Sequence, residues 1–353
     1  MPGVRVKLIS KDAATPYSGM LPGLIAGHYS FDDAHIEMGP LCEFAGAEFC
    51  QAAVTGLDLS NRRIRCDGGL EIGFDLLSIN TGSTPGVRGV PGATEFALPV
   101  KPIDRFLQGW EQIANRIQAA PNRAWRIAIV GGGAGGVEVA LAVQYRLMSS
   151  AGGSRVEFHL VTDAAVILPT HNERVREKFT RILRERGVQV HLNHRVIEVK
   201  PDGLVCSPGE TIACDAALWV TTASAPPWIG ESGLQTDADG FVALNDCLQS
   251  FSHPFVFAAG DVAAVVNHPR PKSGVFAVRQ GPPLTNNLRR ALHGEALLPF
   301  HPQTPFLSLI STGDRYAVAS RGDWALEGKW VWRWKNWIDR RWIRRYRELP
   351  ARM

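Results

Sequence analysis

The sequence predicts an α/β protein with parallel sheets, and three observations lead to this fold class. Apolar runs of strand length alternate with runs of helical period along most of the chain. A glycine-rich turn at residues 131–136 joins one such strand directly to a helix. The chain has 353 residues, more than one hydrophobic core usually supports, so two domains are expected.

The predicted elements follow one another in a regular order. Short apolar runs predict strands at residues 4–9, 49–59, 62–66, 73–80, 125–130, 155–161, 188–191, 196–200, 216–221 and 253–262. Runs with the 3.6-residue period predict helices at residues 103–119, 137–148, 173–186 and 279–292. A loop punctuated by Pro and Gly, residues 14–23, follows the first strand.

The glycine loop is the most informative segment. Its glycines have the G-x-G-x-x-G spacing and stand at Gly131, Gly133 and Gly136. The first allows a tight turn, the second lets backbone approach a pyrophosphate, and the third lets the helix pack closely on the strand. The helix N-terminus then faces the phosphates. Dinucleotide binding is the favoured interpretation, and a purely structural turn is the alternative.

A second strand supports the same interpretation. The strand predicted at residues 155–161 ends in Thr162-Asp163, at the place where a ribose-binding group is expected. Thr162 stands where Glu is usual and Asp163 follows it, so the preference for NADH or NADPH stays open.

Composition excludes several classes of protein. The chain is 45% hydrophobic and 20% charged, as is ordinary for a folded soluble protein. Its six cysteines form no C-x-x-C pair, which argues against a redox-active disulfide, a zinc site or a secreted disulfide scaffold. The histidines show no metal spacing, so no metal site is predicted. No signal peptide or membrane-spanning run is evident, and a cytoplasmic location is expected.

The C-terminal segment is strongly basic and rich in tryptophan. Residues 329–347 hold eight Lys/Arg and one Asp, a charge of +7, within a chain whose net charge is +4. On a helix, Trp330, Trp334, Trp337, Ile338 and Trp342 would share one broad face. This composition is typical of a helix that lies on a membrane surface, and Trp330–Arg347 is the predicted anchor. Packing on the body or a homodimer contact are the alternatives, and nucleic acid binding is not expected.

Three motifs in fixed order resemble the two-dinucleotide-binding flavoprotein family of pyridine nucleotide oxidoreductases. They are the turn Thr81-Gly82, the glycine loop through Glu138, and Phe257-Ala258-Ala259-Gly260-Asp261. The resemblance implies FAD and NAD(P)H as cofactors and two Rossmann-like domains, the second inserted in the first. The FAD domain would comprise residues 1–100 and 223–295. The NAD(P)H domain would comprise residues 101–222, and residues 296–353 an amphipathic helical region.

Within that family the chain is most similar to type II NADH dehydrogenases. The resemblance implies that Thr15-Pro16, Lys101 and Lys272 lie near the flavin, that Thr81, Gly82, Gly260 and Asp261 bind FAD, and that Glu138 faces the contact between nicotinamide and flavin. It also implies a quinone-like electron acceptor and a position at the inner face of the membrane. The string at residues 15–29 resembles a subgroup found fused ahead of selenophosphate synthetase.

One departure concerns the FAD domain. Such a domain should open with its own strand, glycine loop and helix, but this chain begins at what resembles the second strand, which ends near Ser10. About 30 residues, one βα unit, are expected to precede it. Without that unit the chain should bind FAD weakly.

These observations lead to three functional hypotheses. The first is an FAD-dependent NAD(P)H:acceptor oxidoreductase in which hydride passes to the flavin and then to a quinone-like acceptor. The second is a non-catalytic remnant that binds the nicotinamide nucleotide without FAD. The third is a reductase that serves selenium metabolism.

Overall fold

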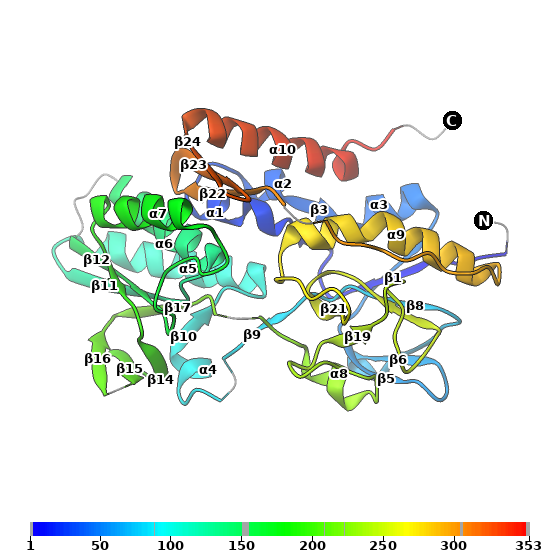
Figure 1. Cartoon of the computed structure of the whole chain (residues 1–353). Coiled ribbons are helices and arrows are strands. Elements are labelled where there is room, and N and C mark those ends of the chain that lie inside the picture. Colours follow the sequence, from blue (N-terminus) through cyan, green and yellow to red (C-terminus); the bar gives the residue numbers. More distant parts are fainter. Residues whose placement is uncertain are drawn as a thin grey trace.

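The computed structural model describes residues 3–87, 89–149, 155–207, 209–221, 223–303 and 306–350. Two α/β parts lie side by side, and a C-terminal part lies across them (Figure 1). The chain passes between the two α/β parts through β9 (Thr84–Pro85) and β18 (Ala223–Ser224), which pair with each other as antiparallel strands. The fold is therefore α/β, as the sequence predicts.

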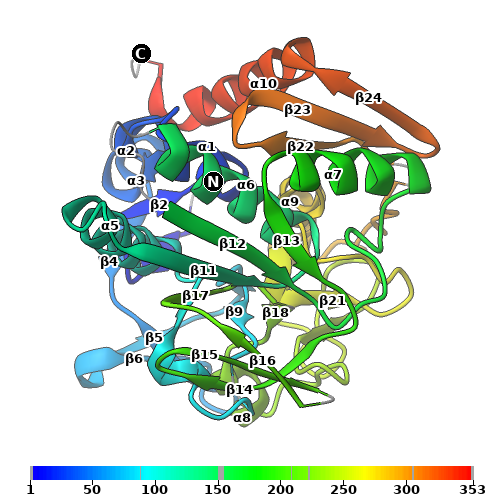
Figure 2. The ribbon, with the colours of Figure 1, turned by 90° about the vertical axis from the view of Figure 1, so that its left-hand side faces the viewer.

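The first α/β part is a five-stranded parallel sheet. Its order is β10 (Ala97–Pro99), β17 (Ala216–Trp219), β11 (Ala124–Val130), β12 (Arg155–Val161) and β13 (Val188–His191). The crossovers are α5 (Ile103–Ala119), α6 (Ala134–Ser149) and α7 (Glu173–Glu185). Ile127, Ala128 and Ile129 in β11 are fully buried because the central strand is covered on both faces. An antiparallel sheet of β14 (Arg195–Lys200), β15 (Gly203–Ser207) and β16 (Glu210–Ala213) lies below it in Figure 2.

The second α/β part combines segments from both sides of this sheet in the sequence. Its strands are β1 (Lys7–Ser10), β2 (Ala14–Pro16), β3 (His35–Glu37), β4 (Glu48–Gln51), β5 (Val54–Asp58), β6 (Arg63–Cys66), β7 (Glu71–Gly73), β8 (Leu77–Ile79), β19 (Val242–Leu244), β20 (Val256–Ala258) and β21 (Ala263–Val265). Its helices are α2 (Phe31–Ala34), α3 (Met38–Ala45), α8 (Pro227–Glu231) and α9 (Gly274–Leu292). Helix α1 (Leu21–Ile25) packs on α6 of the first part, and α4 (Ala93–Phe96) lies near β10.

The parallel strands of this second part form two separate pairs. Strand β1 pairs with β4, and β8 pairs with β20, both in parallel. Among the described residues, no strand pairs with the other edge of β1 or of β8. A Rossmann sheet would place a central strand between two such pairs.

The C-terminal part is a sheet covered by one helix. Strands β22 (Ser308–Thr312), β23 (Asp314–Arg321) and β24 (Trp324–Gly328) are antiparallel, and α10 (Lys329–Arg347) packs on them. Ile310 and Val318 are buried in the same core as Val137 and Leu141 of α6. Each large apolar side chain so buried contributes about 1.5–3 kcal/mol, so this sheet is an integral part of the body.

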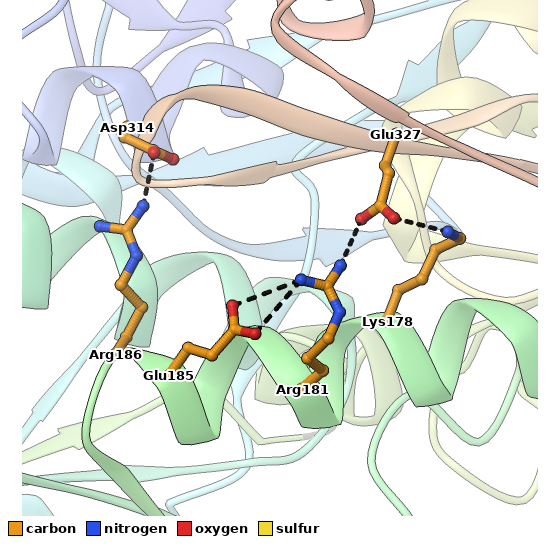
Figure 3. A network of polar contacts seen from close by, with 6 residues as sticks. All are labelled: Lys178, Arg181, Glu185, Arg186, Asp314 and Glu327. Atoms are coloured by element: carbon orange, nitrogen blue, oxygen red, sulfur yellow. Dashed lines mark hydrogen bonds and ion pairs between the residues drawn. The ribbon is translucent and has the colours of Figure 1, made fainter.

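An ionic network also joins α7 to the C-terminal sheet (Figure 3). Glu327 of β24 accepts hydrogen bonds from Lys178 at 2.6 Å and from Arg181 at 2.7 Å. Arg186, just after α7, pairs with Asp314 of β23. Half-exposed pairs contribute about 0.2–1 kcal/mol each, so the network orients the sheet more than it stabilises it.

Several predicted boundaries are wrong, for local reasons. The strand predicted at residues 49–59 is two strands, because β4 pairs with β1 whereas β5 turns into an antiparallel sheet with β6. The strand predicted at 253–262 ends at Ala258, and Gly260, with φ +73°, turns the chain into a 3-10 turn. The sequence did not predict the sheet at residues 308–328, within the region expected to be helical.

Candidate functional site

The glycine loop has the geometry of a phosphate cradle. Gly131 has φ +128°, and a Cβ there would lie 2.4 Å from the carbonyl oxygen of Val220. A Cβ at Gly136 would lie 1.8 Å from the carbonyl oxygen of Gly131, so only glycine lets α6 start this close to β11. A Cβ at Gly133 would meet no atom within 4 Å. The loop therefore presents bare backbone to open space at the head of a helix.

The two residues after β12 occupy different environments. Thr162 is buried, and its side chain lies 2.8–2.9 Å from where a Cβ of Gly132 would stand. Its hydroxyl accepts a hydrogen bond from the backbone N–H of Ala164 at 3.3 Å. Asp163 is exposed. Thr162 thus packs against the loop at Gly132. Of the two predicted ribose-binding residues, Asp163 is the accessible one.

Lys101 and Asp261 meet in a three-residue polar cluster. The Nζ of Lys101 lies 2.7 Å from Oδ2 of Asp261 and donates to Oγ of Ser83 at 2.8 Å. Ser83 Oγ in turn donates to the Asp261 carboxylate at 3.3 Å. The three residues follow β10, β20 and β8, all at carboxyl ends of parallel strands. In α/β folds ligands bind at such ends.

Two glycines shape the same region. Gly82, with φ +71°, precedes Ser83, and Gly260, with φ +73°, precedes Asp261. A Cβ at Gly260 would lie 2.4 Å from Oδ1 of Asn80. Thr81 lies at the surface beside Gly82. The turns predicted to bind FAD therefore lie at the Lys101 cluster, and Ser83 is the member that sequence reasoning missed.

Lys272 lies beside β21. Its Nζ donates a 2.7 Å hydrogen bond to the carbonyl oxygen of Ala263 and lies 3.7 Å from the ring centroid of Phe241. Burial lowers the pKa of Lys272, although the carboxylates of Asp237 and Asp261 oppose this. Lys272 is thus held by its own contacts, within electrostatic range of Asp261.

Glu138 lies where α6 meets the C-terminal part. Its Oε1 accepts a 2.7 Å hydrogen bond from the backbone N–H of Ser311 in β22. Loss of water around the carboxyl raises the pKa of Glu138, and the charge of Lys335 opposes this only in part. A carboxyl in this state retains a proton to higher pH than usual, as proton-donating groups in enzymes do.

Lys335 and Asp339 of α10 complete this group of charges. The Lys335 ammonium donates 2.7 Å hydrogen bonds to the Asp339 carboxylate and to the carbonyl oxygen of Gly19. Burial alone would lower the pKa of Lys335, but the carboxylates of Asp339 and Glu138 outweigh it and raise the pKa. Sequence reasoning missed these two residues, although their i, i+4 spacing was a signal.

The segment at residues 15–29 packs against α10. Thr15 and Pro16 lie in β2, which pairs with β3, and the ring of the following Tyr17 stacks on Trp342 with centroids 4.2 Å apart. The hydroxyl of Tyr29 donates to Asn336 at 2.9 Å. Burial raises the pKa of both tyrosines to about 12. The string therefore binds the inner face of α10.

The two faces of α10 differ from the predicted ones. Val331, Asp339 and Ile343 are buried against the body. Trp342 also faces inward, so the expectation that it shares a face with the other tryptophans is wrong. Three tryptophans remain on the outer face, with exposed fractions of 52% for Trp330, 37% for Trp334 and 55% for Trp337. No described helix is long and apolar enough to cross a bilayer.

Two α/β parts and a nucleotide cradle define a dinucleotide-dependent oxidoreductase fold, and comparisons with known proteins agree. The model of the pyridine nucleotide-disulphide oxidoreductase family matches residues 2–281. The chain therefore belongs to this family, whose members are flavoprotein NAD(P)H oxidoreductases. None of its six cysteines is in a disulfide.

Several relatives are NADH dehydrogenase-like proteins. An NADH dehydrogenase-like protein of Mycobacterium tuberculosis is 28% identical over 240 residues, which are 65% of this chain and 58% of that protein. The demethylphylloquinone reductase NdbB of Synechocystis is 27% identical, over 78% of this chain and 69% of that protein. The chain thus spans less than two thirds of the length of the first of these relatives.

Solved structures share the fold at low identity. The sulfide:quinone oxidoreductase of Aquifex aeolicus superposes with a TM-score of 0.82 at 18% identity, covering 99% of this chain and 86% of that one. The NDH2 structure from Plasmodium falciparum, solved with NADH, superposes with a TM-score of 0.81 at 15% identity, covering 98% and 94%. The two-dinucleotide-binding architecture therefore extends over nearly the whole chain.

The described residues fit the two family cofactors unequally. The open backbone at Gly133 fits the pyrophosphate of NAD(P)H. The Lys101 cluster offers a cation, a hydroxyl and a carboxylate, which suit the flavin and ribityl end of FAD. A second G-x-G-x-x-G loop, which the FAD pyrophosphate requires, is not among the described residues. The FAD site is therefore only partly built by these residues.

Proposed function

We propose that this protein is an FAD-dependent NAD(P)H oxidoreductase that reduces a quinone-like acceptor. The observation that carries the proposal is the position of α6. Its first turn forms part of the dinucleotide cradle. One turn later, Glu138 accepts a hydrogen bond from Ser311 in the C-terminal sheet. Helix α6 thus links the site proposed for NAD(P)H to the carboxyl of Glu138, which is shielded from water.

Each predicted residue has a part in this proposal. The glycine loop holds the pyrophosphate of NAD(P)H through Gly131, Gly133 and Gly136. Asp163 binds the ribose, next to the buried Thr162. On the flavin side, Asp261 and the turns at Gly82 and Gly260 bind the ribityl end, with Thr15, Pro16, Thr81, Lys101 and Lys272 around the ring. These residues would hold FAD, which would supply the two-electron chemistry between NAD(P)H and the acceptor.

The proton balance assigns a task to Glu138. A quinone takes up two protons with two electrons, so NADH and one proton from solvent together supply what the quinol gains. Glu138, with its raised pKa, delivers a proton at the acceptor side. The backbone N–H of Ser311 orients Glu138, and Lys335 keeps a positive charge nearby as negative charge develops on the acceptor.

The outer face of α10 supports a peripheral membrane position. Trp330, Trp334 and Trp337 are exposed there and alternate with arginines such as Arg341. Tryptophan and arginine together suit the headgroup layer of a membrane, where a quinone would be reached. A homodimer contact through the same face is the alternative.

A second candidate function is nicotinamide nucleotide binding without FAD. The edges of β1 and β8 that no described strand pairs with favour it, because the strand that carries the FAD glycine loop would lie between them. The link to selenium metabolism stays a prediction from residues 15–29, which pack against α10.

One experiment separates the two candidates. The purified protein is titrated with FAD, its absorption spectrum is recorded, and NADH and menadione are then added without oxygen. Bleaching of a flavin band by NADH and its recovery on adding menadione support the oxidoreductase. Binding of NADH with no flavin retained and no menadione reduction supports the second candidate.

A further inference from the structure

A basic cleft lies at the C-terminal end of α6, on the opposite end of that helix from the glycine loop. It has a volume of about 600 Å³. Its lining comes from the end of α1, the last turns of α6, the start of β23 and the first residue of α10. The side chains that matter are Tyr145, Arg146, Ser149, Asp314, Arg315 and Lys329. Since α6 rises 1.5 Å per residue, the cleft is about 15–20 Å from the dinucleotide cradle.

The charges of the cleft are unbalanced. Arg315 and Lys329 line it with one carboxylate, Asp314, and with a third cation, Arg146, which has contacts of its own within the chain. That carboxylate is already engaged by Arg186 and by the hydroxyl of Thr312. Arg315 and Lys329 are both exposed, and neither forms an ion pair with another residue in the described part of the chain. The positive charges of Arg315 and Lys329 are therefore available to an anionic ligand.

The backbone at Gly27 passes close to the guanidinium of Arg146. Gly27 has φ +79°, and a Cβ there would lie 2.3 Å from Nη1 of Arg146. A side chain at this position would make the flexible end of Arg146 move, and φ +79° itself favours glycine here. Gly27 belongs to the string at residues 15–29, whose C-terminal end the proposed function leaves unexplained.

We propose that this cleft binds a phosphate group, carried by a phospholipid headgroup or present as free phosphate. Guanidinium groups bind phosphate through paired, charge-assisted hydrogen bonds, and a lysine ammonium adds a point charge. The hydroxyls of Tyr145 and Ser149 add further donors. The exposed Trp330 follows Lys329, so a headgroup in the cleft would have an aromatic neighbour at the membrane interface.

The test is a calorimetric titration of the full chain with inorganic phosphate, in a buffer without other oxyanions. Arg315→Ala/Lys329→Ala should weaken phosphate binding about tenfold or more, because two charge-assisted contacts are lost. Arg321→Ala is the matched control, since it removes an exposed charge from the far end of the same strand. An equal loss in the control, an unchanged affinity in the double variant, or no binding to the wild type would overturn the proposal.

A second variant separates this site from the dinucleotide cradle. Gly133→Val blocks the glycine loop and should leave phosphate binding by the cleft unchanged. Loss of phosphate binding in Gly133→Val would assign the ion to the loop and overturn the inference.

Short-chain lipids identify the source of the phosphate. Dihexanoyl phosphatidylglycerol, kept below its micelle concentration, is compared with inorganic phosphate. Tighter binding of the lipid than of phosphate, lost in Arg315→Ala/Lys329→Ala, assigns a headgroup. Equal or weaker binding of the lipid assigns free phosphate, and both results support the site.

Discussion

The ammonium of Lys101 lies 2.7 Å from Oδ2 of Asp261, and this contact joins residues 160 positions apart. The pair brings the segment after β10 to the turn after β20, with Ser83 bonded to both. It therefore ties the two α/β parts together at the proposed flavin site. Removing one partner leaves the other as a half-buried charge without its counterion.

Asp261→Ala should lose FAD before it loses nicotinamide nucleotide. The carboxylate that accepts from Lys101 and is proposed to bind the ribityl chain disappears, while the glycine loop is untouched. Fluorescence titrations with FAD and with NADH measure the two affinities separately. If NADH binding falls as much as FAD binding, Asp261 holds the fold together and has no specific task at the flavin.

In protein whose FAD site is complete and loaded, Gly133→Val should abolish reduction of the flavin by NAD(P)H while the flavin stays bound. The valine side chain meets no protein atom, so the protein folds, but it fills the space that the pyrophosphate needs. Rapid-mixing absorbance at the flavin band measures the reduction. Gly73→Val is the matched control, because that glycine also faces open space and lies in β7. Unchanged kinetics in Gly133→Val refute the assignment of the loop.

Glu138→Gln should slow acceptor reduction by about a hundredfold, the lower range for loss of a general acid, and affect flavin reduction much less. Glu177→Gln, an exposed glutamate of α7, is the control. Equal slowing of both half-reactions in Glu138→Gln would mean that the residue positions the nicotinamide instead.

The same substitution changes how stability depends on pH. Because the native pKa of Glu138 is raised, the native state keeps a proton that the unfolded chain releases. The stability from that proton is full below the ordinary carboxyl pKa and is lost as pH rises through the raised native value. Glu138→Gln should therefore show a smaller fall in melting temperature than the wild type between pH 5 and 8. A parallel fall in both proteins would contradict the shift.

Trp330→Ala/Trp334→Ala/Trp337→Ala should weaken binding to vesicles of anionic lipid without unfolding the protein. These side chains are exposed, whereas deleting residues 329–350 would uncover Val331 and Ile343 and remove Lys335. Binding should also weaken at high salt, since each basic residue near the surface contributes about 1 kcal/mol through screened attraction. Phe251→Ala, another exposed aromatic, is the control. If the triple variant binds vesicles as fully as the wild type, the outer face of α10 is not a membrane contact, and a dimer contact is the remaining interpretation.

The protein produced from Met1 should bind FAD weakly. The described residues hold one glycine loop, and β1 and β8 each have an unpaired edge. Fusing a βα unit that carries a glycine loop ahead of the chain should strengthen binding, because its strand would fill the sheet and its helix would face the pyrophosphate. A stoichiometric flavin spectrum in the protein from Met1 would show that the present residues suffice.

Features that depend on neighbours along the chain are predictable from the amino-acid sequence. The spacing of Gly131, Gly133 and Gly136 predicts the cradle because each glycine acts on its own turn, strand or helix. Alternating strand and helix periods predict the parallel sheet for the same reason. The motif Gly260-Asp261 marks its turn, since φ +73° at that position favours glycine.

The contacts between distant residues, in contrast, depend on how the elements pack. Ser83 joins Lys101 and Asp261, and Lys335 bonds to Gly19, 316 positions earlier. Helical period groups Trp342 with the other tryptophans, but its stacking on Tyr17 turns it inward. Periodicity records which residues share a face of one element. Which face is buried depends on the shape and charge of the segment it packs against, and that segment lies hundreds of residues away.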